Sequence, residues 1–229
     1  MVAAKMDKKD LDQPDAFQEA VGKVMTYARE NRQKLYAASG ALALVIVLVA
    51  GYFFYSAHTE SEAAKLYFEA RMKVMKADPM GMGLAGPEAA KAFEGVVEKY
   101  PSSDAAQGAR YELGNLYFTA GDYDRSIQVY RTFVDKASGK DIRTVYAWFG
   151  IGYSHEAKKE YDKALEAFNR VADSKPGNVH EGLSYRNIAR IYEEMNDRGK
   201  ALDYYRKALE KTKDPAASSL LKRKIAQLG

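Results

Sequence analysis

Hydrophobic and polar residues divide this chain into one long apolar segment followed by a series of amphipathic segments. The apolar segment runs from Leu35 to Ala57 and contains no Asp, Glu, Lys, Arg or Pro. A helix of this length is about 34 Å long at roughly 1.5 Å per residue, enough to cross a hydrocarbon layer of about 30 Å. Aromatic residues stand near both of its ends, as they do in helices that end at the lipid headgroups. The pattern therefore predicts a transmembrane helix over residues 35–57.

The length and position of the segment favour a permanent anchor over a cleaved signal. A secretory signal has an apolar run of about 7 to 15 residues that ends in small residues. Here the run is longer, 34 residues precede it, and the bulky Tyr55 stands where a small residue is needed. We therefore expect the chain to stay attached to the membrane.

Basic residues predict the orientation of this anchor. Arg29, Arg32 and Lys34 lie close to its N-terminal side, whereas Lys65 is the one basic residue among the first ten that follow the segment. Basic residues favour the cytoplasmic side of a membrane. We expect residues 1–34 in the cytoplasm, and residues 58–229 on the other side of the membrane as one domain.

A shorter amphipathic segment precedes the span. Its apolar residues recur at spacings of four, three and four, which places them on one face of a helix: Phe17, Val21, Val24 and Ala28. Asp12 or Gln13 can cap this helix, and Pro14 fits its first turn. The face can lie on the bilayer, dock on a partner, or belong to a plain helical lead-in to the span. Residues 1–11 show no pattern and are predicted to be disordered.

Beyond His58 the apolar positions follow a helical period and the chain repeats itself. The clearest unit, residues 145–176, carries small, aromatic and proline residues at fixed places: Trp148, Ile151, Gly152, Tyr161, Ala164, Phe168 and Pro176. These places match the pattern of the tetratricopeptide repeat, a helical hairpin of 34 residues, and the unit resembles that family. His155 departs from the pattern, because the family prefers an aromatic residue there.

Related copies flank this unit. Gly114 lies 38 residues before Gly152, and Ala189 lies 37 residues after it, so connections three or four residues longer than usual are expected. A degenerate first copy combines residues 60–77 with residues 89–101 around an insert at 78–86, and residues 216–228 resemble a capping helix.

The resemblance implies an all-α fold with one transmembrane helix, followed by an α-solenoid of about four tetratricopeptide-like hairpins and a C-terminal capping helix. In this family small residues let the two helices of a hairpin approach closely, which implies that Gly152 and Ala164 face each other with Trp148 buried nearby.

Composition excludes several classes of binding site and reaction. The net charge is +4, and Lys and Arg are interspersed with Asp and Glu, so no nucleic-acid footprint is present. The absence of cysteine excludes disulfides, thiolate zinc sites and cysteine nucleophiles. His58, His155 and His180 show no metal spacing, and no nucleophile paired with a general base is indicated. We expect a protein that is not an enzyme and has no metal, cofactor or small-molecule substrate, with His155 packed in the core.

Two further motifs lie near residue 80. Residues 81–86 fit G-x-G-x-x-G, but no strand precedes them, so a loop is expected rather than a dinucleotide site. Four of the 8 methionines also gather here: Met72, Met75, Met80 and Met82. They indicate core packing, an adaptable surface for a partner, or a Cu(I) site built from thioethers.

The resemblance also implies a binding surface. Family members bind other proteins along a concave face formed by the first helix of each hairpin. Alignment on Gly114, Gly152 and Ala189 carries this face over to eight residues: Tyr111, Asn115, Phe118, Tyr146, Phe149, Tyr153, Arg186 and Arg190. We expect these side chains to point away from the core, in a groove that is aromatic in its middle and basic toward its C-terminal end. The carboxylate-clamp subclass of the family needs several Lys and Asn residues at these places. Only Asn115 matches, so this subclass is weakly indicated.

The layout of a basic-flanked tail, a single span and a repeat domain is also similar to the YfgM-type ancillary subunits of the bacterial Sec translocon. This implies a non-enzymatic scaffold in the inner membrane, with residues 58–229 in the periplasm. The implied partners are translocon subunits, periplasmic chaperones or unfolded clients. Two alternatives stay open. One is a scaffold subunit of another envelope complex, in secretion, outer-membrane assembly or cell-wall machinery. The other is a copper-handling protein that uses the methionine cluster.

Overall fold

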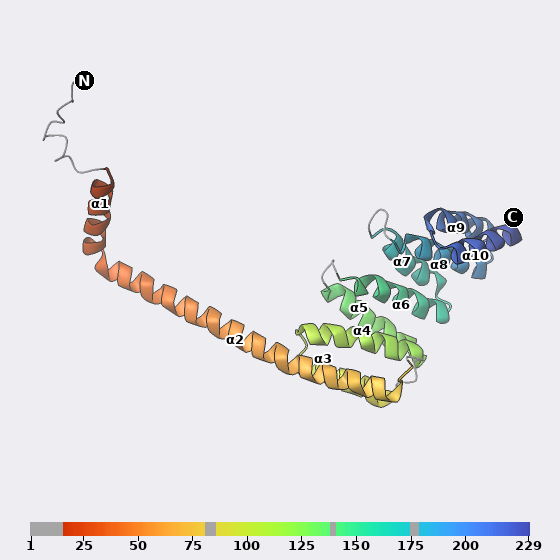
Figure 1. The fold of residues 1–229 in the computed structure, drawn as a ribbon, viewed down its shortest axis with the longest axis horizontal. Coiled ribbons are helices and arrows are strands. Elements are labelled where there is room, and N and C mark those ends of the chain that lie inside the picture. The colour runs from red at the N-terminus through yellow and green to blue at the C-terminus, as the bar shows by residue number, and fades with distance from the viewer. Residues whose placement is uncertain (1–15, 81–85, 138–140, 175–178) are drawn as a thin grey trace, which may run out of the picture. The chain divides into compact units, whose positions relative to one another are not determined.

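The computed structural model describes residues 16–80, 86–137, 141–174 and 179–229 (Figure 1). The expectations for residues 1–11, for the cap near Pro14, for Met82 and for most of the glycine-rich motif lie outside these ranges. The described residues contain ten helices and no strand: α1 (Ala16–Glu30), α2 (Arg32–Ala77), α3 (Pro87–Lys99), α4 (Asp104–Thr119), α5 (Tyr123–Lys136), α6 (Arg143–Ala157), α7 (Tyr161–Ala172), α8 (Glu181–Glu194), α9 (Arg198–Lys211) and α10 (Pro215–Leu228).

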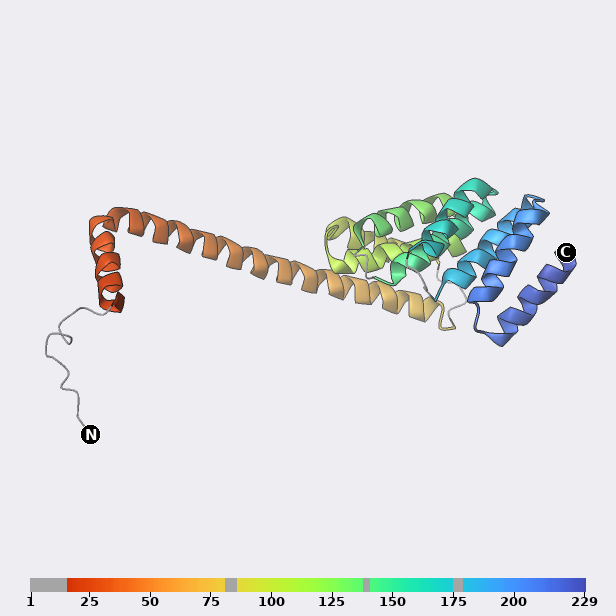
Figure 2. The same cartoon turned by 90° about the horizontal axis from the view of Figure 1, so that it is seen from above.

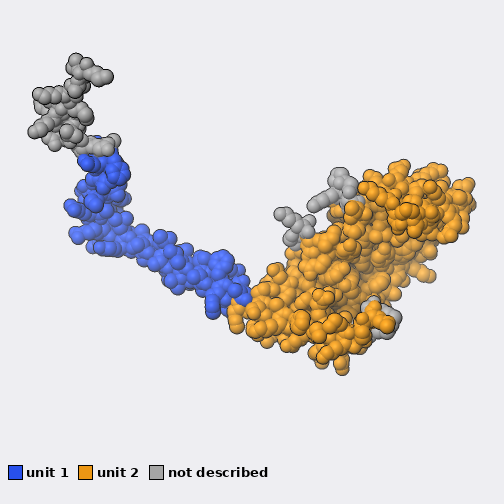
Figure 3. Space-filling view, viewed as in Figure 1, with its two compact units in different colours: residues 1–57 blue, residues 58–229 orange. Residues whose placement is uncertain are grey.

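The chain divides into two compact units, residues 1–57 and residues 58–229 (Figure 3). The first unit holds α1 and the first part of α2. In the described part of the chain, α2 is the one helix that is long and apolar enough to cross a membrane, with a mean hydropathy of 2.2 in its most apolar window. None of that window is buried, and side chains such as Ile46 and Leu48 are exposed.

Helix α2 joins the expected span and the expected first repeat helix in one element. No Pro or Gly occurs from Tyr52 to Ala77, so the sequence contains no residue that would end the helix after the apolar segment. The helix ends at Ala77 because Asp78 precedes Pro79, and the residue before a proline disfavours helical dihedrals.

The second unit is a row of helical hairpins. The end of α2 pairs with α3, α4 with α5, α6 with α7, and α8 with α9, while α10 packs on α9 and closes the row (Figures 1 and 2). Neighbouring hairpins stack through contacts of α3 with α4, α5 with α6, and α7 with α8. The α-solenoid of four hairpins with a terminal helix is confirmed.

The first hairpin is tied to the second by a carboxylate. Glu60 of α2 accepts hydrogen bonds from the backbone N–H groups of Asp104, at 2.9 Å, and Ala105, at 3.0 Å. These groups belong to the first turn of α4, where no partner exists within the helix itself. Ala63 and Ala70 of α2 are buried in the hydrophobic core that α2 forms with α3 and α4.

Aromatic rings fill the spaces left by glycine. A Cβ atom on Gly114 of α4, or on Gly150 of α6, would lie 2.4 Å from the ring of Tyr130, so this ring of α5 sits between two glycines. A Cβ on Gly152 would lie 2.4 Å from the ring of Phe168. The expected close approach at Gly152 is therefore present, and the atoms nearest to its Cβ position belong to the ring of Phe168 of α7.

The turns inside three hairpins share one conformation. Gly121, Lys159 and Asn196 have φ values of 77°, 58° and 60°, and each precedes an acidic residue. Two of these acids, Asp122 and Asp197, accept a hydrogen bond from a backbone N–H group of the helix that follows. The third hairpin uses its acid, Glu160, in another way.

Candidate functional site

Three of the expected binding residues meet around one cleft. Phe118 of α4, Tyr153 of α6 and Arg190 of α8 line a cleft of about 510 Å³. The three side chains are half-buried, so each has both a packed side and a free side. They come from the first helices of three successive hairpins, as the family alignment implied.

A second cleft adjoins the first. Tyr153, Arg186 and Arg190 line it together with residues of α8, α9 and α10, and its volume is about 260 Å³. Because Tyr153 and Arg190 belong to both clefts, we call the two together the Tyr153 groove.

The ring of Tyr153 is held in place from several sides. It stacks on Phe149 with ring centroids 6.2 Å apart and meets Phe168 edge-on at 5.3 Å. Asn187, which is 1% exposed, donates a hydrogen bond from its amide nitrogen to the hydroxyl of Tyr153 at 2.8 Å. A ring fixed in this way loses little freedom when a ligand packs against it.

Two of the three basic groups in the second cleft are already paired. Arg190 forms two hydrogen bonds to Glu156, one of them at 2.8 Å, and its guanidinium lies 5.9 Å from the ring centroid of Tyr153. Lys224 of α10 contacts both carboxylate oxygens of Glu193, at 2.8 and 3.0 Å. Burial alone would raise the pKa of Glu193, but the hydrogen bonds from Lys224 and Tyr205 outweigh it and hold that pKa below its usual range.

Arg186 is different. Among the described residues its guanidinium has no hydrogen bond or ion pair, although it is half-buried. It also lines a third cleft of about 600 Å³ between α8, α9 and the start of α10. The acidic residue of that cleft, Glu181, is paired with Lys211 at 3.1 Å. Arg186 therefore lines two clefts as a cation that can bind an anionic group of a partner.

The other four expected residues have different surroundings. The ring of Tyr111 packs on Tyr130 and Phe133. The side-chain amide oxygen of Asn115 accepts a hydrogen bond from the hydroxyl of Tyr130 at 2.5 Å. Both residues therefore support the packing of α5.

Phe149 corrects an expectation. This residue is 4% exposed and belongs to the core between α6, α7 and α8, so it does not point away from the core. Tyr146, one turn earlier, is 44% exposed and contacts the ring of His180 at 5.3 Å. The family alignment places both residues on one helical face. His180, just before α8, contacts both rings, but the ring of Phe168 packs on Phe149 and Tyr146 stays exposed.

Sequence reasoning missed the polar partners of the groove. Asn187 follows Arg186 directly, yet its burial under Tyr153 has no signal in the sequence. Glu156 lies 34 positions before Arg190, which is the family's usual period but three fewer than the spacing of Gly152 and Ala189, so it gives only a weak signal for an ion pair between hairpins. Lys224 is on α10, outside the repeats, so no alignment of repeats could have found it.

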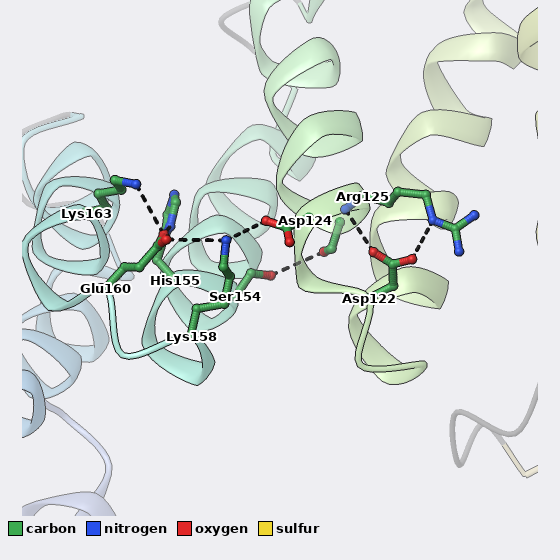
Figure 4. Close-up of polar contacts among 9 residues, drawn as sticks. Asp122, Asp124, Arg125, Ser154, His155, Lys158, Glu160 and Lys163 are labelled. Atoms are coloured by element: carbon green, nitrogen blue, oxygen red, sulfur yellow. Dashed lines mark hydrogen bonds and ion pairs between the residues drawn. The ribbon is translucent and has the colours of Figure 1, made fainter.

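A separate polar cluster connects the second and third hairpins (Figure 4). Lys158 reaches Asp124 at 2.5 Å and Glu160 at 3.3 Å, and the hydroxyls of Ser126 and Ser154 lie 3.3 Å apart. These contacts join the first part of α5 to the end of α6 and the turn before α7. They fix how the hairpins stack and contain no nucleophile paired with a general base.

His155 lies in this cluster and is a core residue, as expected. It is 4% exposed, and its Nδ1 lies 2.6 Å from Glu160 Oε2, while its Nε2 has no hydrogen-bond partner among the described residues. Burial lowers the pKa of His155, so the ring is neutral at pH 7 and Nδ1–H donates to the carboxylate. This hydrogen bond, helped by Lys158 and Lys163, lowers the pKa of Glu160 to about 2.

The methionine cluster stays open as a candidate surface. Met75 and Met80 are exposed, whereas Met72 is half-buried on α2. Among the described residues no group of three or more His, Cys, Asp or Glu side chains is arranged to hold a metal ion.

The stacked hairpins with a groove along their first helices define an α-solenoid, the class of repeat proteins that bind along one face. Models of the family described as tetratricopeptide repeat match residues 86–142, 111–179 and 184–217, which together make up more than half of the chain. The chain belongs to the tetratricopeptide repeat family, whose members mediate protein–protein interactions.

Two relatives are similar to part of this chain. Lipopolysaccharide assembly protein B of Escherichia coli K12 is 26% identical over 106 residues, 46% of this chain and 26% of the relative. Photosystem I assembly protein Ycf3 of Prochlorococcus marinus is 31% identical over 80 residues, 35% of this chain and 45% of the relative. The chain therefore spans less than half the length of either relative.

A solved structure shares the fold. The crystal structure of TPR-like repeats assigned to a Podosopora anserina kinesin light chain has a TM-score of 0.55 to this chain at 14% identity. The match covers 74% of this chain and 86% of that one, and it shows the fold alone.

Proposed function

We propose that this protein is a membrane-anchored, non-enzymatic scaffold that binds extended protein segments in the Tyr153 groove. The observation that carries this function is the position of Arg186, a half-buried cation without an acidic partner among the described residues. It lines one cleft together with Tyr153, and Tyr153 and Phe118 line the adjoining cleft with aromatic surface. Such a site favours a segment that offers an apolar side chain next to an acidic group or a chain terminus.

The membrane anchor is the second part of the proposal. Residues 35–57 form an uncharged, fully helical and exposed stretch of α2, and Arg29, Arg32 and Lys34 precede it. These features support a single span with residues 1–34 in the cytoplasm and residues 58–229 in the periplasm of a bacterium.

Within the envelope, we propose an accessory role at the Sec translocon and with periplasmic chaperones, where exported chains are still unfolded. The support is the layout, a short tail, one span and a repeat domain, together with a groove suited to extended chains. A repeat domain of this kind needs no reaction chemistry, because binding along its face is sufficient for a hand-over role.

A second candidate is a scaffold in another envelope-assembly complex. The relative from Escherichia coli is named for lipopolysaccharide assembly, and its similarity covers 46% of this chain. The copper-handling alternative rests on the sequence alone, and metal analysis of the purified protein tests it.

Photo-crosslinking in native membranes separates the two scaffold roles. A photoreactive amino acid at Phe118, on the rim of the groove, should capture partners that the same amino acid at the exposed Arg206 of α9 does not capture. Translocon subunits, chaperones or exported chains among those partners would support the first candidate. Proteins of lipopolysaccharide or outer-membrane assembly would support the second, and equal captures at both positions would refute a binding role of the groove.

A further inference from the structure

Helix α1 has an apolar face that no other described residue covers. Phe17 and Val24 are 73% and 68% exposed, and Val21 and Tyr27 are exposed as well. A helix of 15 residues that leaves this much apolar surface in water is stabilised only when something covers it.

The two faces of α1 are sharply divided. At about 100° per residue, Phe17, Val21, Val24 and Ala28 fall within roughly 60° of one another around the helix axis. The opposite face carries Glu19 and Lys23, which form an exposed ion pair at 2.8 Å, together with Gly22 and Thr26. This division into an apolar and a charged face is typical of helices that lie at a membrane interface.

The position of α1 in the chain decides what covers this face. α1 ends at Glu30, α2 begins at Arg32, and the uncharged segment begins at Leu35. Five residues span at most about 18 Å when fully extended, and less when most of them are helical. If residues 35–57 cross the bilayer, the end of α1 therefore lies within the headgroup layer. There the surface of the hydrocarbon layer lies directly beside the helix.

The junction itself favours this placement. The chain changes direction at Asn31, so α1 does not continue along the axis of the first turns of α2 (Figures 1 and 2). A helix that turns away from a spanning helix at the membrane surface extends along that surface. Arg29, Arg32 and Lys34 stand at the turn, where they can contact anionic headgroups.

We propose that α1 is a lipid-binding helix that lies in the headgroup layer with Phe17, Val21 and Val24 inserted toward the acyl chains. The inference rests on the proposed membrane anchor and adds a second, independent contact with the bilayer. Lipid is the occupant, rather than a second copy of the chain, because the short connection to the span holds the apolar face at the depth where acyl chains begin.

The absence of cysteine makes a direct test possible, because a single introduced cysteine carries the only label. The full chain is reconstituted in phosphatidylcholine and phosphatidylglycerol vesicles with an environment-sensitive fluorophore at Val24→Cys, Thr26→Cys or Val45→Cys. Lipids brominated near the headgroup end of the acyl chain quench fluorophores that lie at that depth, and iodide quenches fluorophores in water. Thr26 lies on the polar face and is the matched control for Val24.

We expect brominated lipid to quench the label at position 24 at least about twofold more than the label at position 26, with iodide showing the reverse order. Equal quenching at both positions overturns the inference. A label at position 24 that neither lipid nor iodide reaches is covered by protein, which also overturns it.

The label at position 45 tests the proposed membrane anchor separately from the role of α1. Lipid brominated near the bilayer centre should quench the label there, whatever the outcome for α1. If that label is instead open to iodide, residues 35–57 do not span the bilayer and the proposed anchor fails. If position 45 is quenched while positions 24 and 26 are not, the anchor stands and only the role of α1 is lost.

Discussion

Glycine and aromatic residues determine the packing at the scale of single residues. The repeat pattern marked Gly114 and Gly152 as places of close approach, and both places are filled by a ring from the following helix. The pattern could not say which ring, and it did not mark Gly150, because a ring wedged between two helices depends on the rotamer of Tyr130 and not on spacing alone. Sequence therefore located the contacts, and the structure supplied the partners.

The close approach at Gly152 is testable by adding one methyl group. Gly152→Ala places a Cβ atom 2.4 Å from the ring of Phe168, so the ring or the helix must move. We expect a loss of about 1 to 3 kcal/mol in the free energy of unfolding, measured by urea denaturation of residues 58–229. Gly95→Ala is the control, because nothing lies within 4 Å of its Cβ and alanine favours a helix by about 1 kcal/mol. Equal effects of the two changes would contradict this packing.

Binding in the groove is testable at Tyr153 and Arg186. Tyr153→Ala removes an aromatic contact of the kind that commonly contributes about 2 kcal/mol or more to an interface. Arg186→Ala removes the cation that has no acidic partner in the described part of the chain. We expect it to weaken binding of a peptide with an acidic C-terminus but not of its amidated, uncharged counterpart. Fluorescence anisotropy with both peptides measures the difference.

The control for this experiment is Arg206→Ala, which removes an exposed arginine of α9 whose ion pair with Asp203 is 3.8 Å long. A change at Phe149 is unsuitable, because truncation of a buried phenylalanine costs about 3 to 5 kcal/mol of stability. If Arg186→Ala and Arg206→Ala affect both peptides alike, Arg186 is not part of the binding surface.

At the scale of helices, the positions of the elements were the most predictable feature of the fold. The four hairpins and the last helix lie where the sequence placed them, because small and aromatic residues recur at fixed places whose packing demands are local. The burial of Phe149 was not predictable, since it depends on contacts with Phe168 of α7 and with His180 just before α8. The two parts of α2 were expected from their separate patterns, and their union follows from the absence of a helix-breaking residue between them.

The turn before α7 predicts a dependence of stability on pH. Burial lowers the pKa of His155 below its ordinary value of 6.5, so below that pH the unfolded chain binds more protons than the folded chain. The stabilisation is therefore complete above about pH 6.5 and decreases as the pH falls toward the lowered pKa. Glu160, with a pKa of about 2, stays ionised throughout this range and does not contribute to the change.

We expect the thermal midpoint of residues 58–229 to fall between pH 7.5 and pH 5. His155→Phe, which restores the aromatic residue typical of the family, should reduce this fall because it removes the titrating group. Glu160 keeps Lys158 and Lys163 as partners in the variant. The same fall in both proteins would show that other groups control the response to acid.

At the scale of the whole chain, the proposed topology is open to a protease test. Protease added to cells with a permeabilised outer membrane should digest residues 58–229 once the domain is destabilised, while a tag at the N-terminus remains protected. The reason is the basic cluster of Arg29, Arg32 and Lys34 on the N-terminal side of the span. A protected C-terminal domain and a digested tag would reverse the orientation and remove the periplasmic function.

The contact of Glu60 with α4 determines where this protein can be cut. The family models begin to match at residue 86, which suggests a natural boundary there. A fragment that began at that residue would lose the acceptor for two N–H groups of α4, and it would expose the side of Phe93 and Val96 that the end of α2 covers. A fragment that starts at His58 keeps both. We therefore expect the smallest fragment that folds in water to be longer than the region matched by the family models, with a first helix that begins inside α2.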